Sequence, residues 1–164
     1  MMSKKIKNIM FMLILYIAGF CMGCSWIFKR KYEYEKSLCC RVDKLRRIIG
    51  VLDYWLELKE YEKNISYYFK QMNFKNIAVY GVGHLGKHLI KELNWSGVNI
   101  DYIIDKNIEE VDENITIYRP DDILPSVDAV VVTAIADFDE IVDRLNLAVN
   151  CPILSLEDII FNMY

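Results

Sequence analysis

The sequence lacks the residue spacings that are typical of metal sites and of structural disulfide bonds. Its only histidines, His84 and His88, stand four residues apart, and nothing nearby in the sequence completes a set of metal ligands. The five cysteines show no spacing typical of a disulfide framework, and Cys21-x-x-Cys24 falls inside an apolar run where packing is a simpler role than redox chemistry. The sequence therefore predicts no metal site, and its cysteines are compatible with a reducing cytosol.

The C-terminal half has little positive charge. Residues 73–164 carry 6 Lys and Arg against 16 Asp and Glu, whereas residues 1–72 carry 14 against 7. An acidic half without a basic stripe argues against nucleic-acid binding. The basic half adjoins an apolar segment, where anionic lipid head groups would favour positive charge.

The N-terminal region lacks any charge over residues 9–28, a run of 20 residues that is long enough for a helix to cross a bilayer. No A-x-A cleavage site closes this run, so we interpret residues 1–31 as an uncleaved single-pass membrane anchor. Basic residues flank both ends, but the positive stretch is longer on the C-terminal side, through Arg46 and Arg47. That asymmetry favours a cytoplasmic location for the C-terminal domain.

The juxtamembrane segment, residues 32–72, lacks proline, and residues 32–60 read as helix throughout. Two sets of apolar residues repeat at intervals of seven in residues 38–56, namely Leu38, Leu45 and Leu52, and between them Val42, Ile49 and Leu56. This spacing is typical of a coiled coil and suggests a homodimer through residues 38–56, with β-branched residues at two of three a-type positions, as parallel dimers prefer. The alternative is an amphipathic helix that folds back on its own domain, an interpretation favoured by Trp55. A short helix over 65–72 follows, with Asn64 as its N-cap.

Residues 76–105 carry the most specific pattern in the chain. An apolar strand over 77–80 stops at the glycines of G-x-G-x-x-G, Gly81, Gly83 and Gly86, which open an amphipathic helix. A second strand over 99–104 ends in Asp105. In dinucleotide-binding proteins the first glycine permits a tight turn, the second admits a pyrophosphate, and the third allows close packing of helix on strand. The helix N-terminus attracts the phosphates, and the acid accepts the ribose hydroxyls.

The remaining sequence completes an α/β fold. We predict strands over 115–118, 129–133 and 151–155, and helices over 137–147 and 156–161, with a helical turn at 120–124 and an acidic loop at 106–114. Asp137 and Glu140 form a capping-box pattern for the first of these helices. Residues 73–164 are thus expected to form a single Rossmann-like parallel sheet of order 3-2-1-4-5, with its crevice at the carboxyl ends of strands one and four.

The crevice is expected to bind a dinucleotide or a nucleotide sugar. The acid at position 105 favours NAD over NADP because it would repel a 2′-phosphate. His84 could contact a phosphate, and the small residues after strand four leave room for a ring or sugar. The expected binding residues are Gly81, Gly83, His84, Leu85, Gly86, Asp105, Lys106, Thr133 and Ala134.

A series of motifs resembles a bacterial family of small Rossmann domains that occur with cell-surface polysaccharide and glycosyltransferase genes. The motifs are Trp55-Leu56, Ile65, Tyr68-Phe69, IAVYGVGHLG, Leu89, Glu92-Leu93, YIIDK, VVVTAI, FDEI and SLEDII. More distantly, the chain is similar to the N-terminal nucleotide-binding domain of membrane-bound nucleotide-sugar dehydratases and epimerases. The resemblance spans residues 52–161 and implies a fold and a polysaccharide-biosynthesis partner, but no activity.

Three functional hypotheses follow. The first is a membrane-anchored, cytoplasmic nucleotide-binding module, accessory or regulatory in surface polysaccharide biosynthesis. The second is a minimal NAD-dependent nucleotide-sugar dehydrogenase or dehydratase completed by a partner. The two Tyr-x-x-x-Lys matches, Tyr32…Lys36 and Tyr102…Lys106, are misplaced for such an enzyme, so catalysis is not favoured. The third is a docking platform that keeps the fold without a ligand.

Overall fold

The computed structural model describes residues 4–106 and 115–163, and it divides into two units, residues 1–45 and residues 46–164. The N-terminal unit is helical throughout its described residues, as part of the long helix α1 (Lys4–Glu60). Apolar side chains over residues 9–28 are exposed in the described part of the chain, Ile14 by 59% and Phe20 by 66%. This helix is long and apolar enough to cross a membrane.

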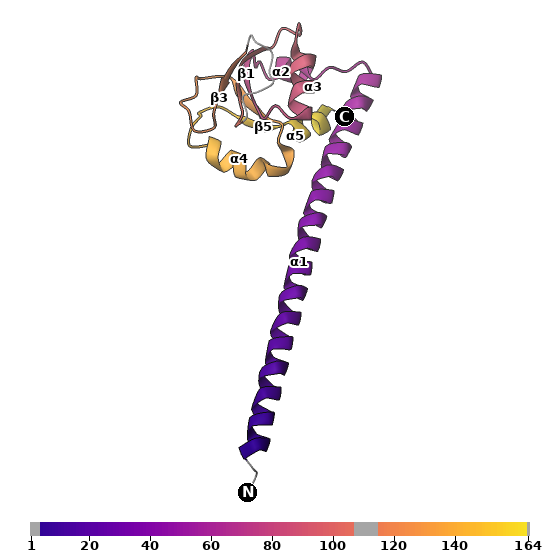
Figure 1. The fold of residues 1–164 in the computed structure, drawn as a ribbon. Coiled ribbons are helices and arrows are strands. Elements are labelled where there is room, and N and C mark those ends of the chain that lie inside the picture. Colours follow the sequence, from indigo (N-terminus) through magenta and orange to yellow (C-terminus); the bar gives the residue numbers. More distant parts are fainter. Residues whose placement is uncertain (1–3, 107–114, 164) are drawn as a thin grey trace. The chain divides into compact units, whose positions relative to one another are not determined.

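The compact unit is built on a five-stranded, all-parallel sheet in the order β3-β2-β1-β4-β5, which confirms the predicted fold class and strand order. Figure 1 shows strands of this sheet between α3 and α4. The strands are β1 (Asn76–Tyr80), β2 (Asn99–Ile104), β3 (Thr116–Tyr118), β4 (Ala129–Val132) and β5 (Ile153–Ser155). The central strands consist of consecutive apolar residues and are buried on both faces, as a parallel sheet requires.

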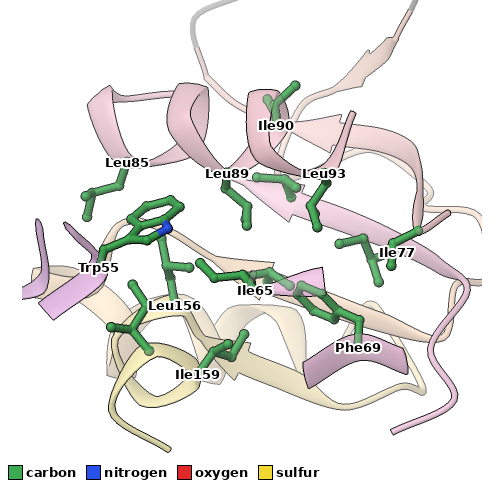
Figure 2. Close-up of a cluster of buried hydrophobic side chains, with 14 of the residues drawn as sticks. Trp55, Ile65, Phe69, Ile77, Leu85, Leu89, Ile90, Leu93, Leu156 and Ile159 are labelled. Carbon is green, nitrogen blue, oxygen red and sulfur yellow. The ribbon is translucent and has the colours of Figure 1, made fainter. Parts of the chain in front are cut away.

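Helices cover both faces of this sheet. They are α2 (Ser66–Gln71), α3 (His84–Leu93), α4 (Phe138–Leu145), preceded by the short 3-10 turn η1 (Ile135–Asp137), and α5 (Leu156–Met163). On one face, α2, α3, α5 and the end of α1 enclose the larger part of the core, shown in Figure 2. On the other face, residues such as Ile141 and Leu145 of α4 pack against Ala78, Tyr80 and Tyr102 of the strands.

The end of α1 belongs to the core of the compact unit. Val51, Trp55 and Leu58 are at most 5% exposed and pack in the same cluster as α2, α3 and α5. This part of the helix therefore folds back on the domain, one of the two alternatives that the sequence allows. The compact unit accordingly begins at Arg46, earlier than the boundary at residue 73 expected from the sequence.

A carboxylate secures this packing. Glu92 of α3, whose side chain is only 6% exposed, accepts hydrogen bonds from Trp55 Nε1 (2.7 Å) and from the backbone N–H of Ile65 (2.7 Å). The same carboxylate forms an ion pair with Lys59. A nearly buried charge needs such partners to be tolerated. Glu92 thereby links α1 and α3 to Ile65, the residue that precedes α2.

Three local predictions differ from the structure or fall outside it. Residues 120–124 do not form a helical turn; the chain makes a reverse turn closed by the N–H of Asp122 donating to Arg119 O, at 3.0 Å. Asp137 precedes α4 but makes no capping hydrogen bond through its side chain, so the predicted capping box is wrong. Its backbone (φ −118°, ψ 20°) lacks the extended conformation of an N-cap, because α4 continues from the turn η1. The acidic loop at 106–114 lies outside the described residues from 107 onward.

Candidate functional site

The three motif glycines meet three different steric demands at the turn from β1 into α3. Gly81 has a φ of +89°, a left-handed conformation that side chains disfavour. A Cβ on Gly86 would lie 2.2 Å from the carbonyl oxygen of Gly81, so the start of α3 can approach the turn only without a side chain. A Cβ on Gly83, by contrast, would meet no atom within 4 Å. Gly81 and Gly86 thus serve the fold itself, whereas Gly83 leaves open space above the turn.

Asp105 lies beside this turn because β2 pairs with β1 in parallel. Tyr80 is the register partner of Ile104, so the residues that follow each strand, Gly81 and Asp105, leave the sheet together. The carboxylate Oδ2 of Asp105 accepts a hydrogen bond of 2.6 Å from the backbone N–H of Val82. The sequence places Asp105 at the end of β2, and the structure adds that its carboxylate holds the glycine turn.

Thr133 holds the turn from the opposite side. It follows β4, is 5% exposed, and its hydroxyl donates a hydrogen bond to the carbonyl oxygen of Gly81 at 2.7 Å. Its backbone N–H also donates to Tyr80 O, at 3.0 Å. The Thr133 side chain thus stabilises the turn through its bond to Gly81, and the next residue, Ala134, lines the cleft.

The turn forms one wall of a cleft of 460 Å³ at the carboxyl ends of β1 and β4, where the strand order reverses. Ligands of open α/β sheets bind at such switch points. The cleft is lined by Tyr80, Gly81, Asp105, Lys106, Ala134, Asp137, Glu140, Ile141 and Arg144. Four of these were expected from the sequence, namely Gly81, Asp105, Lys106 and Ala134.

The residues that sequence reasoning missed come mainly from α4. Glu140 and Arg144 are four residues apart and so share one face of α4, and Asp137 lies just before this helix, in η1. Their place in the chain could have indicated this role, because α4 follows β4, one of the two strands that border the switch point. The capping-box pattern assigns Asp137 to the backbone of the helix start and gives no reason to place Glu140 and Arg144 in the cleft.

Both acidic and basic side chains lie near the phenol of Tyr80. Burial raises the pKa of Tyr80 above its ordinary value, and the carboxylates of Asp105 and Glu140 raise it further, whereas Arg144 opposes the shift. Arg144 is itself paired with Glu140, at 3.2 Å. At neutral pH the Tyr80 hydroxyl is therefore protonated and able to donate a hydrogen bond within the cleft.

The other expected binding residues lie at the start of α3. His84 is exposed at its first position, whereas Leu85 is only 4% exposed and packs in the core. Leu85 can therefore serve a ligand only through its backbone N–H. His88, one turn further on, lies edge-on to Trp55 with ring centroids 6.2 Å apart. Among residues 4–106 and 115–163, no group of three His, Cys, Asp or Glu side chains is arranged to hold a metal ion.

Together these residues can hold a phosphorylated, hydroxyl-rich molecule. The N–H groups in the first turn of α3 have no acceptor within the helix and carry its positive dipole, so they suit phosphate oxygens. Asp105 suits hydroxyl groups, and the cleft, which charged side chains of both signs line, extends from the turn towards α4. No protein-family model, curated protein or solved structure matches this chain.

Proposed function

We propose that the chain is a membrane-anchored module whose crevice binds NAD or a nucleotide sugar. The observation that carries this proposal is the asymmetry among the motif glycines. Gly81 and Gly86 are required by the backbone itself, but Gly83 meets nothing, although a side chain would fit there within the protein. A glycine at such a place is explained when a ligand, such as a pyrophosphate, approaches the backbone closely.

The residues around the turn fit a dinucleotide. The N–H groups of the first turn of α3 would hold the pyrophosphate, and Asp105 would accept hydrogen bonds from ribose hydroxyls. The carboxylate of Asp105 is already directed to the turn by its bond to Val82 N–H, so it needs no rearrangement. Asp105 would also repel a 2′-phosphate, which favours NAD over NADP, whereas Lys106 beside it works in the opposite direction.

We further propose that the module is accessory or regulatory in the assembly of surface polysaccharides, with its C-terminal domain in the cytoplasm. Support comes from the motif resemblance over residues 52–161, the long apolar helix, and the basic residues that follow it. In this proposal the ligand orders the turn at 82–86, the loop at 106–114 and the segment at 134–137. A partner protein would then recognise the ordered surface. The part of the loop at 107–114 lies outside the described residues.

Thermal unfolding of residues 46–164 tests the binding. This fragment retains the whole core cluster, including Val51, which a fragment beginning at residue 52 would lose. NAD, NADP, UDP-sugars and coenzyme A would be added separately. A ligand at one hundred times its Kd should stabilise the fragment by about 2.7 kcal/mol, roughly 10 °C in Tm for a domain of this size.

Two matched glycine variants identify the site. Gly83→Asp adds bulk and negative charge where the phosphates would lie, so it should abolish the ligand-induced shift without lowering the Tm of the free fragment. Gly50→Asp is the control, because Gly50 lies in α1 and a Cβ there also meets no atom within 4 Å. The proposal is contradicted if Gly83→Asp responds to ligand as strongly as Gly50→Asp does. If no nucleotide shifts the Tm of the unsubstituted fragment, the hypothesis of a ligand-free docking platform takes its place.

A further inference from the structure

Helix α1 carries a second apolar face, whose side chains are exposed among the residues that the structure describes. The core receives Ile48, Val51, Leu52, Trp55 and Leu58. Most members of the seven-residue repeats point elsewhere, since five of the six are 45–64% exposed. We name these five the seam: Leu38 (48%), Val42 (45%), Leu45 (59%), Ile49 (64%) and Leu56 (60%). The fold-back therefore uses a different face from the coiled-coil pattern and does not compete with it.

We propose that the seam pairs with the seam of a second copy of this chain, forming a parallel two-stranded coiled coil. The spacing alternates four and three from Leu38 to Ile49, which is the pattern that places knobs into the holes of an identical helix. Val42 and Ile49 are β-branched residues at a positions, with leucine at the d positions Leu38 and Leu45. That combination favours two parallel strands. Leu52, the remaining d position, is packed against the core, so the main contact runs from Leu38 to Ile49.

The apolar anchor supplies the parallel orientation, because two copies inserted in the same sense present their seams side by side. The same register also continues towards the N-terminus. It places Phe28, Cys24, Cys21 and Ile17 at successive a and d positions. The apolar pattern is interrupted at Lys31 and Glu35, which occupy the next d and a positions and form an ion pair at 3.7 Å on the helix surface. Pairing through the seam can thus extend along the apolar segment.

One charge contact opposes this pairing and makes it testable. In a parallel coil, the g position of one helix faces the following e position of the other. Arg41 occupies g and Arg46 occupies e in this register, so two arginines from different copies would face each other. Arg46→Glu should therefore strengthen the association, and added salt should strengthen the unsubstituted dimer by screening the repulsion.

The experiment measures the dimerisation of the full chain in lipid nanodiscs or dilute detergent, by light scattering and by single-molecule photobleaching. Val42→Lys places a charge in the seam and should raise the dimer Kd by about tenfold or more, because it removes buried apolar area from both helices. Cys40→Lys is the matched control: Cys40 is exposed two residues away at an f position, and its substitution should leave the Kd unchanged.

Further outcomes separate the seam from other interfaces. Gly19 and Gly23 fall outside the a and d positions, so Gly19→Ile should leave the dimer intact. The proposal is overturned if the unsubstituted chain is monomeric, or if Cys40→Lys dissociates the dimer as much as Val42→Lys. It is also overturned if Gly19→Ile dissociates the dimer and Val42→Lys does not. The Tm of the compact unit should be the same in all variants, since none of these side chains contributes to its core.

Discussion

Replacing Gly86 by alanine should destabilise the domain, although alanine is the better helix former. The added Cβ would lie 2.2 Å from the backbone oxygen of Gly81 and 3.2 Å from the hydroxyl of Thr133. Neither neighbour can move easily, because Gly81 is already at a φ of +89° and Thr133 is hydrogen-bonded to it. Overpacking of this kind costs about 3 kcal/mol. The higher helix propensity of alanine returns about 1 kcal/mol, which leaves a net loss of about 2 kcal/mol.

Urea unfolding of residues 46–164, followed by circular dichroism, measures this loss. Gly83→Ala is the control three residues away, where a Cβ meets nothing and the φ of −65° suits alanine. Gly83→Ala should change the free energy of unfolding by less than about 1 kcal/mol, because the reduced freedom of the unfolded chain favours alanine whereas the N-cap position that Gly83 occupies favours glycine. The steric explanation is refuted if both variants change the free energy of unfolding equally, or if Gly86→Ala stabilises the fragment.

Two further substitutions test other parts of the structure. Glu92→Ala should lower the free energy of unfolding by about 2–4 kcal/mol, since it leaves an indole N–H, a backbone N–H and a lysine without their acceptor. Glu140→Ala is the control: its side chain is 77% exposed, so the free energy of unfolding should change little in the same urea titration. Tyr102→Phe should cost about 1 kcal/mol at neutral pH by removing the 2.8 Å hydrogen bond to Pro125 O. Burial raises the pKa of Tyr102 from 10.0 to about 12, so the stability linked to its protonated form is complete below pH 10 and declines as the pH approaches 12. The free energy of unfolding of the unsubstituted protein, minus that of Tyr102→Phe, should therefore decrease over that interval. An increase would contradict this assignment.

The sheet order was predictable because its signals are local. Consecutive apolar residues such as Ala129–Val132 mark buried parallel strands, and the glycine motif marks the first turn. Right-handed crossovers then leave few ways to order five strands. The positions of Gly81, Gly86 and Asp105 in the site followed from the same local pattern.

The cleft wall formed by α4 was harder to predict. Tyr80 and Arg144 are far apart in sequence and lie together only because β1 and β4 are neighbours in the sheet. Asp137 matched a local capping pattern, yet the backbone that leads into α4 does not have the conformation of a cap. Local pattern rules assume a helix that starts from extended backbone, and here the 3-10 turn η1 precedes it.

The sequence by itself determined that residues 9–28 and 32–60 are helical, the second with apolar repeats, and that the glycine turn joins β1 to α3; the structure joins the two helical segments into the single helix α1. Both follow from spacing along the chain, which sets which residues share a face. Only the tertiary structure decided which apolar face of α1 the domain covers. Trp55 and Glu92 are 37 residues apart and form a hydrogen bond on the face of α1 that contains Val51 and Leu58, which is the face that packs in the core. Periodicity identifies a face but not its partner, because the hydrophobic effect has no direction and any complementary apolar surface satisfies it.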